Sequence, residues 1–209
     1  MLPNIIAIEG PDGVGKSTFC QTLKQALGVI ATVQKTPPED LFEYARLAGP
    51  SGSLGAFFAF MVGNAIVSNF RTETPWMILD RYLLSTFVYH ESEIMRAHID
   101  FELVSRTSHC RPPMLTVLLE CPVEVVDSRL RVRGESRTAS DLTVSSKLSK
   151  SFAQSASNPS IASCIGRLLC LSNATQQDLE ANLSAVVKAV TELEGGDTRI
   201  PRKVQQSES

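Results

Sequence analysis

The chain has 209 residues, a length that suits one α/β domain of good size and is short for two. With 43% hydrophobic and 20% charged residues, its composition is that of an ordinary globular protein and excludes a disordered or fibrous chain. The formal net charge of -2 gives no overall electrostatic reason to bind nucleic acid or an anionic membrane, so we expect neither as a partner.

The first half of the chain alternates apolar runs typical of buried strands with segments of helical periodicity. Gly28 ends the first helix, and Pro37 and Pro38 stop the second strand. The predicted elements, in chain order, are a strand at 4–9, a helix at 16–27, a strand at 29–34, helices at 38–48 and 55–71, and a strand at 76–80.

The second half repeats this alternation. Its predicted elements are helices at 82–97 and up to 108, a strand at 114–120, helices at 123–133 and 141–157, a strand at 168–173 and a helix at 175–194. A helix after every strand predicts a three-layer α/β/α fold, in which a five-stranded parallel sheet carries helices on both faces. We expect one domain over residues 1–194 and a disordered polar tail over residues 195–209.

The five cysteines are odd in number and contain no CxxC pair, which argues against a disulfide framework or a zinc knuckle. The N-terminal residues lack the basic region and long apolar stretch of a signal peptide. The apolar run at 54–67 is shorter than the ~18 residues that a membrane span needs. We therefore expect a cytoplasmic protein with reduced thiols.

The segment GPDGVGKST at 10–18 matches the pattern GxxxxGK[ST] and lies between a strand and a helix, the context that a P-loop requires. Its backbone N–H groups would surround phosphate oxygens, while Lys16 neutralises the β- and γ-phosphates and Ser17 binds Mg²⁺. The sequence thus predicts a P-loop NTPase fold with ATP and Mg²⁺ as cofactors. The residues expected to bind ATP in this segment are Gly10, Asp12, Gly13, Val14, Gly15, Lys16, Ser17 and Thr18.

A second charged pair, Asp80 and Arg81, follows the third predicted strand. The carboxyl ends of parallel strands meet at the edge of the sheet where open α/β folds bind ligands. Asp80 is suited to hold Mg²⁺ or to accept a proton, and Arg81 to hold a second phosphate through two hydrogen bonds. Together with the P-loop, this pair indicates phosphoryl transfer.

The segments IAIEGPDGVGKST, LDRYLLSTFVYH and RLRVRGESR, in this order, resemble the thymidylate kinase family of nucleoside monophosphate kinases over residues 4 to about 194. The resemblance implies that Asp12 meets the sugar hydroxyl of the acceptor, that Arg81 binds its 5'-phosphate and that Tyr89 lines the same pocket. By position alone, Asn173 would lie at the donor adenine.

The resemblance also implies a lid at about 131–145, whose arginines close on the ATP phosphates. Arg131, Arg133 and Arg137 fall in this range, and Arg129, just before it, is interpreted as part of a solvated helix face. Lid arginines supply the positioning and charge stabilisation that phosphoryl transfer needs. The residues expected to take part in catalysis are Lys16, Asp80, Arg81, Arg133 and Arg137.

The chain departs from the family pattern in three places. The arginine-bearing turn after the second strand is replaced by QKTPP, which leaves Lys35 to contact phosphate, and the lid lacks the usual Asp-Arg pair after RGE. On the helix before the third strand, Phe60 matches the phenylalanine that stacks on the pyrimidine. Asn64 stands one turn later, where the family has an arginine.

An asparagine side chain offers donors and an acceptor, so thymine, uracil and cytosine all stay open as the base that Asn64 meets. Phe57 and Phe58 fit a core or a dimer interface equally well, and a helix that is apolar on nearly all sides must bury more than one face. That surplus apolar surface suggests a homodimer, as the resemblance also implies.

The function predicted is transfer of the ATP γ-phosphoryl group to a pyrimidine nucleoside monophosphate, with dTMP as the first choice. Two alternatives remain open: a kinase for nucleosides or other small hydroxyl compounds, and a non-catalytic nucleotide-binding protein.

Overall fold

The computed structural model describes residues 1–50, 52–134 and 139–195. The first half of the chain forms β1 (Asn4–Glu9), α1 (Lys16–Leu27), β2 (Ala31–Lys35), α2 (Glu39–Leu47), α3 (Leu54–Ser68) and β3 (Trp76–Asp80). The second half forms α4 (Leu83–Arg96), α5 (Phe101–Thr107), β4 (Leu115–Glu120), α6 (Val123–Val132), α7 (Ala139–Ala156), α8 (Pro159–Ile165), β5 (Arg167–Ser172) and α9 (Gln176–Gly195).

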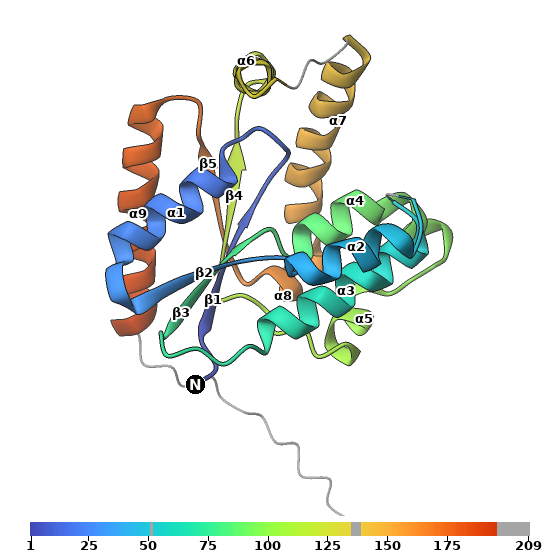
Figure 1. Ribbon diagram of the computed structural model, residues 1–209, viewed down its shortest axis with the longest axis horizontal. Helices are drawn as coiled ribbons and strands as arrows, with labels where there is room; N and C mark the ends of the chain where they lie inside the picture. The colour runs from blue at the N-terminus through green and yellow to red at the C-terminus, as the bar shows by residue number, and fades with distance from the viewer. Residues whose placement is uncertain (51, 135–138, 196–209) are drawn as a thin grey trace, which may run out of the picture.

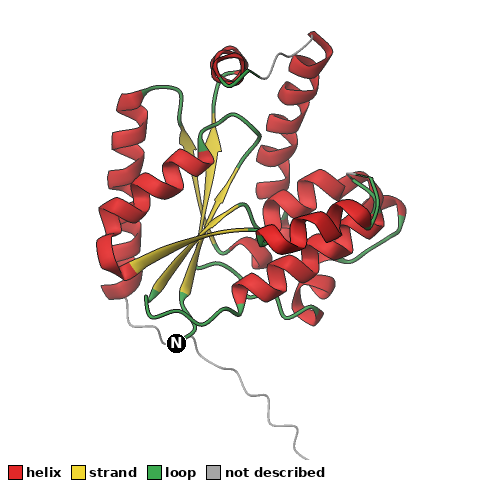
Figure 2. Cartoon of the chain, viewed as in Figure 1, coloured by secondary structure: helices red, strands yellow, loops and turns green. Residues whose placement is uncertain are grey.

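The five strands form one parallel sheet in the order β2-β3-β1-β4-β5. β1 lies at its centre and is buried over most of its length, because both faces of the sheet are covered. Figures 1 and 2 show the sheet with α1 and α9 on one side and the group α2 to α5 on the other. The predicted three-layer α/β/α fold is confirmed.

Two apolar clusters, one on each face, hold the layers together. The first joins the sheet to α1 and α9, through side chains that include Phe19, Leu23, Val186 and Val190. The second joins the opposite face to α3, α4, α7 and α8, through side chains that include Phe57, Phe87, Phe152 and Ile161. Burial on both faces of the sheet explains why its strands are continuous apolar runs in the sequence.

The parallel register aligns the strand ends that carry the predicted site. Asp80 at the end of β3 pairs with Lys35 on one side and with Ile8 on the other. β1 continues directly into the glycine-rich turn before α1. Three predicted site segments therefore meet at the carboxyl edge of the sheet.

Most predicted elements are present with boundaries within a few residues, and two details differ. Residues Gly28–Ile30 form a 3-10 helix, so β2 begins two residues later than predicted. A short helix, α8, starts at Pro159 after the capping side chain of Asn158 and was not expected. Part of the predicted lid, 135–138 with Arg137, and most of the predicted tail, 196–209, lie outside the described residues.

Within the described residues, no helix combines the length and apolar character that crossing a membrane requires.

Candidate functional site

The phosphate loop between β1 and α1 needs glycine at two positions where a side chain would not fit. Gly10 and Gly15 adopt φ angles of 134° and 95°, which side-chain-bearing residues rarely take. A Cβ atom at Gly10 would lie 2.5 Å from the Leu119 carbonyl oxygen, and one at Gly15 would lie 2.9 Å from Asn173 Nδ2. The loop is thus packed closely against the ends of β4 and β5.

Lys16 lies at the first turn of α1 with its side chain buried against the loop. Its Nζ donates a 2.6 Å hydrogen bond to the Pro11 carbonyl oxygen. Burial and the nearby Arg81 guanidinium lower its pKa to about 8, although Asp12, Asp80 and Glu9 oppose this shift. The negative charge of a bound triphosphate would stabilise the protonated form of Lys16.

Ser17, the next residue, joins the loop to β3. Its Oγ donates a 2.6 Å hydrogen bond to Asp80 Oδ2. A hydroxyl and a carboxylate side by side are hard oxygen ligands, and Mg²⁺ is usually held by one or two such groups together with waters and substrate phosphates. This donor set fits Mg²⁺, and no cluster of three or more His, Cys, Asp or Glu ligands occurs in the described part of the chain.

Asp12, Arg81 and Tyr89 form a connected group beside the loop. Arg81 Nη2 forms an ion pair with Asp12 Oδ1, and Tyr89 donates a 3.2 Å hydrogen bond to Asp12 Oδ2. The Arg81 guanidinium also lies over the Tyr89 ring, 5.2 Å from its centroid. Burial would raise the pKa of Asp12, but Arg81 and Lys16 hold it below its usual value. The acceptor residues implied by the family resemblance therefore meet in space.

A cavity of about 450 Å³, here called the phosphate cavity, opens between the P-loop and the ends of β2 and β3. The predicted site residues in its lining are Asp12, Gly13, Gly15, Lys16, Ser17, Lys35, Asp80, Arg81 and Arg133. Its cations come from four separate segments of the chain. They converge on one space, as a site for several phosphate groups requires.

A second cavity of about 260 Å³, here called the base cavity, shares Asp12, Thr36 and Arg81 with the phosphate cavity. Phe60 and Tyr89 line it as predicted. Asn64 is not in its lining: the side chain is buried and its Nδ2 donates a 2.9 Å hydrogen bond to Thr86 Oγ1. The structure therefore gives no support to the predicted direct contact between Asn64 and a base.

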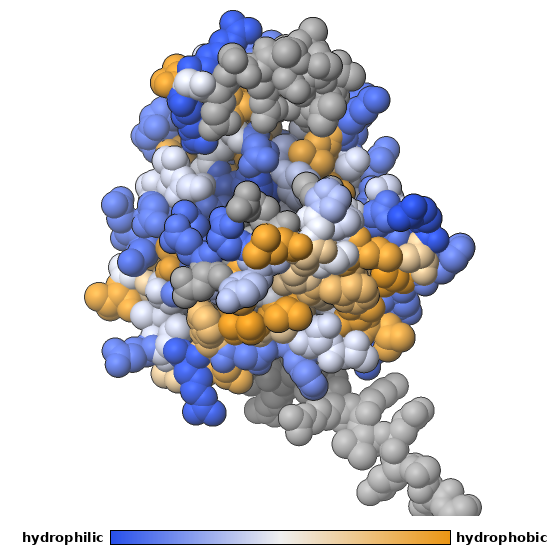
Figure 3. Space-filling view, turned by 45° about the vertical axis from the view of Figure 1, so that its right-hand side comes forward, coloured by the Kyte–Doolittle hydropathy of each residue, from blue (hydrophilic) through white to orange (hydrophobic). Residues whose placement is uncertain are grey.

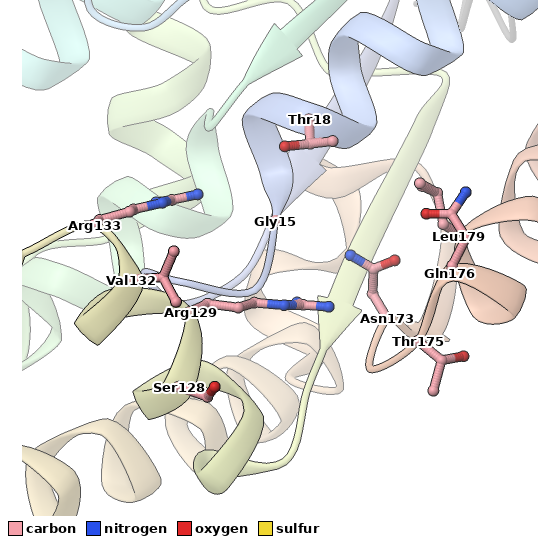
Figure 4. A pocket seen from close by; sticks show the side chains of 10 residues that line it. All are labelled: Gly15, Thr18, Ser128, Arg129, Val132, Arg133, Asn173, Thr175, Gln176 and Leu179. Carbon is pink, nitrogen blue, oxygen red and sulfur yellow. The ribbon is translucent and has the colours of Figure 1, made fainter.

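The third cavity, of about 380 Å³, lies on the other side of the P-loop between α6 and the start of α9 (Figure 4). Arg129 on α6 and Arg133 directly after it extend into this cavity, and Thr18 and Asn173 line it as well. Asn173 Nδ2 donates a 2.7 Å hydrogen bond to the Val14 carbonyl oxygen, and its Oδ1 has no hydrogen-bond partner among the described residues. We call this space the donor cavity, because the predicted position of the phosphate donor ATP lies here.

The interpretation of Arg129 as a solvated residue is wrong. Its guanidinium is half-buried and donates hydrogen bonds to the carbonyl oxygens of Val14, at 3.2 Å, and Ala174, at 3.0 Å. It thereby links α6 to both the P-loop and the segment after β5. The spacing of four residues to Arg133 places both on one helix face, which was the signal available in the sequence.

Arg131, in contrast, points away from this face. It pairs with Asp127 over 2.8 Å and lines none of the three cavities. The structure therefore gives no support to its predicted contact with ATP phosphates. Arg137, the remaining predicted lid residue, lies outside the described residues.

Sequence reasoning also missed Glu9, a fully buried carboxylate at the end of β1. It accepts hydrogen bonds from Leu84 N, at 3.1 Å, and from Ser85 N, at 3.2 Å, and so caps the start of α4. Burial raises its pKa to about 7, against the opposing effects of Ser85 and Arg81. A glutamate inside an otherwise apolar strand was the available signal.

The fold, the phosphate loop and the converging cations define the chain as a P-loop nucleotide-binding protein. No protein-family model matches it. It is 28% identical over 140 residues to a probable thymidylate kinase 1 from Saccharolobus solfataricus, a match that covers 62% of this chain and 71% of that protein. A solved thymidylate kinase from Candida albicans has the same fold, with a TM-score of 0.61, 16% identity, and coverage of 90% of this chain and 92% of the other. These matches agree with the three sequence segments: the chain is similar to thymidylate kinases in sequence and shares their fold.

Proposed function

We propose that the protein is an ATP-dependent nucleoside monophosphate kinase that converts dTMP to dTDP. The observation that carries this proposal is the junction of the phosphate cavity with the base cavity, which share Asp12, Thr36 and Arg81. A nucleotide whose base lies against Phe60 can reach the cations beside the P-loop with its 5'-phosphate. A site for a free nucleoside would not need Arg81 at this junction.

The chemistry consists of one phosphoryl transfer. An oxygen of the acceptor 5'-phosphate forms a bond to the γ-phosphorus of ATP, and the bond between that phosphorus and the β,γ-bridging oxygen breaks, which releases ADP. Lys16 would neutralise charge on the β- and γ-phosphates, and Arg81 would hold the attacking phosphate. Arg133, the residue that directly follows α6, lines both the phosphate and donor cavities and is therefore suited to stabilise the negative charge that develops on the transferring phosphoryl group.

Mg²⁺ would be held by Ser17 and Asp80, where it offsets phosphate charge and orients the triphosphate. The 2.6 Å hydrogen bond between Ser17 Oγ and Asp80 Oδ2 supports this assignment, because it already brings the two oxygens together. ATP would occupy the donor cavity with its adenine near Arg129 and Asn173.

A homodimer belongs to the same proposal. Phe58, Val62 and Ile66 on α3, and Phe70 just after it, recur every four residues, with 37% to 54% of their surface exposed. In Figure 3, hydrophobic residues gather on the side of the molecule where α2 and α3 lie. An exposed apolar stripe of this kind fits a second copy of the chain. The five free cysteines support a reducing compartment such as the cytoplasm.

The direct test is an ADP-release assay with ATP, Mg²⁺ and each deoxynucleoside monophosphate and nucleoside in turn. We expect turnover with dTMP and none with thymidine, and Lys16→Ala should abolish it. Turnover with nucleosides alone would assign the protein to a different class of kinase. Binding of ATP with no turnover of any acceptor would contradict the proposal.

A further inference from the structure

A buried histidine, His90, lines the base cavity beside Phe60. Its side chain is 3% exposed, and its ring centroid lies 5.5 Å from that of Phe60. His90 lies seven residues after Leu83, where α4 begins, which places it about 10 Å along the helix axis. Arg81 precedes the helix, so His90 lines the part of the cavity that is further from the phosphate-binding cations.

The hydrogen bonds of His90 fix which of its ring nitrogens can meet a ligand. Nδ1 lies 2.8 Å from the Thr86 carbonyl oxygen, and because a carbonyl only accepts, Nδ1 carries the proton. Burial lowers the pKa of the ring, which is therefore neutral at pH 7. Nε2 is then a pure acceptor, and it is buried with no hydrogen-bond partner among the described residues. A buried acceptor left without a partner destabilises the protein, and a ligand with an N–H group would provide the missing hydrogen bond.

The neighbouring polar side chains are already committed. Asn64 Nδ2 donates to Thr86 Oγ1 over 2.9 Å, and Thr86 Oγ1 donates in turn to the Tyr82 carbonyl oxygen over 3.1 Å. The Thr86 hydroxyl thus has no proton left to donate. Asn64, which stands where the family has an arginine, is thus bonded to Thr86, and His90 Nε2 is the buried acceptor without a partner in the lining of the base cavity.

We propose that His90 determines the base specificity of the kinase, with its Nε2 accepting a hydrogen bond from the N3–H group of a thymine stacked on Phe60. The inference rests on the proposed function, because dTMP is the ligand that brings this base. Thymine offers one N–H group on its ring, at N3, between two carbonyl oxygens. It is the donor that a neutral imidazole acceptor can pair with.

The same geometry disfavours cytosine. Its N3 carries a lone pair in place of hydrogen, so two acceptors would face each other across the cavity wall. Sites that leave buried polar groups unpaired reject the wrong ligand strongly. Uracil keeps the N3–H group and should be accepted as thymine is, apart from the contribution of the methyl group.

The test compares kcat/KM for dTMP, dUMP and dCMP in the wild type, His90→Phe, His90→Gln and the control His98→Asn. His98 is exposed after α4 and has a positive φ of 52° that asparagine tolerates. We expect the dTMP-to-dCMP ratio to fall at least tenfold in His90→Phe, whereas the dTMP-to-dUMP ratio stays unchanged. His90→Gln, whose amide both donates and accepts, should also gain activity on dCMP. A His90→Phe ratio within twofold of the wild type would overturn the proposal.

A substrate-side arm needs no variant to fold. The wild type should use 3-deaza-dUMP, in which C–H replaces N3–H, at least tenfold less well than dUMP, and equal use would overturn the proposal. If the wild type phosphorylates no monophosphate, the proposed function fails by itself. Calorimetric titration with dTMP then tests the role of His90. Weaker dTMP binding by His90→Phe than by the wild type, with unchanged ATP binding, supports this role. Equal dTMP binding by the two proteins, or no dTMP binding by the wild type, overturns it.

Discussion

Ser17 Oγ donates a hydrogen bond to Asp80 Oδ2 over 2.6 Å, which joins the first turn of α1 to the carboxyl end of β3. The two residues are 63 positions apart in the chain. They meet because β1 and β3 are parallel neighbours in register, and α1 starts where the turn after β1 ends. The contact places a hydroxyl and a carboxylate oxygen side by side, and the described residues hold no cluster of three or more His, Cys, Asp or Glu ligands there.

Removing either partner should weaken the use of Mg²⁺. For Ser17→Ala and Asp80→Asn we expect kcat/KM for ATP to fall by about 10–100-fold, consistent with about 1.5–3 kcal/mol for a bond to a charged group. The Mg²⁺ concentration for half-maximal rate should rise. Thr22→Ala, which removes an exposed hydroxyl that donates to the Thr18 carbonyl oxygen on the same helix, is the control. Equal Mg²⁺ requirements in all three variants would exclude the assignment.

Arg81 should act on the acceptor more than on ATP. In Arg81→Lys the charge stays, but the planar guanidinium is lost, whose donors reach Asp12 and Ser85 and would hold the acceptor phosphate. We expect KM for dTMP to rise about tenfold or more, with KM for ATP changing much less. Arg106→Lys, an exposed arginine on α5, serves as the matched substitution. A larger effect on ATP than on dTMP would mean that Arg81 belongs to the donor side.

Much of the fold follows from the sequence, because strands buried on both faces must be continuous apolar runs and a P-loop must follow one of them. The pairing of Ser17 with Asp80 was also predictable, since parallel strands end at one edge. Helix α8 was missed because its start depends on the cap from Asn158 within a Ser-rich segment. Local signals of this kind are weak until the surrounding packing is known.

The side chains of the site were harder to predict than its backbone. Asn64 was expected to face a base, whereas its amide Nδ2 donates a hydrogen bond to Thr86 Oγ1 on α4. His90 was overlooked and Arg129 was interpreted as solvated, because their roles come from contacts with other elements: Phe60 on α3 for His90, and the carbonyl oxygens of Val14 and Ala174 for Arg129. Periodicity shows which residues share a face, but it does not show what that face contacts.

The depressed pKa of Lys16 predicts a pH dependence of ATP use. In the free enzyme, burial and Arg81 lower this pKa to about 8, so the ammonium group loses its proton as the pH rises through that value. We expect kcat/KM for ATP to fall above about pH 8, since this parameter reports the free enzyme. The fall in kcat should come at higher pH, because bound phosphates favour the charged lysine. Identical midpoints for kcat and kcat/KM would contradict this interpretation.

Glu9 predicts a pH dependence of folding stability. Its pKa is about 7 in the folded protein and 4.5 as the reference for an exposed carboxyl, so between these values the folded state binds more protons. Stability should therefore decrease as the pH rises through this window, by about 3 kcal/mol in total at 1.36 kcal/mol per pKa unit. Glu9→Gln cannot titrate and should lack this slope.

The measurement is urea unfolding of both proteins at about pH 5 and about pH 8, with Glu73→Gln, an exposed carboxyl before β3, as the control. In Glu9→Gln an NH2 group replaces one of the two oxygens that accept from Leu84 N and Ser85 N, so one hydrogen bond is lost. This loss of stability is the same at every pH and therefore cancels when the slopes are compared. Because the cap of α4 also positions Ser85 beside Arg81, the same variant should raise KM for dTMP. Parallel stability profiles for the wild type and Glu9→Gln would show that the buried carboxyl keeps an ordinary pKa, held there by the helix N-terminus.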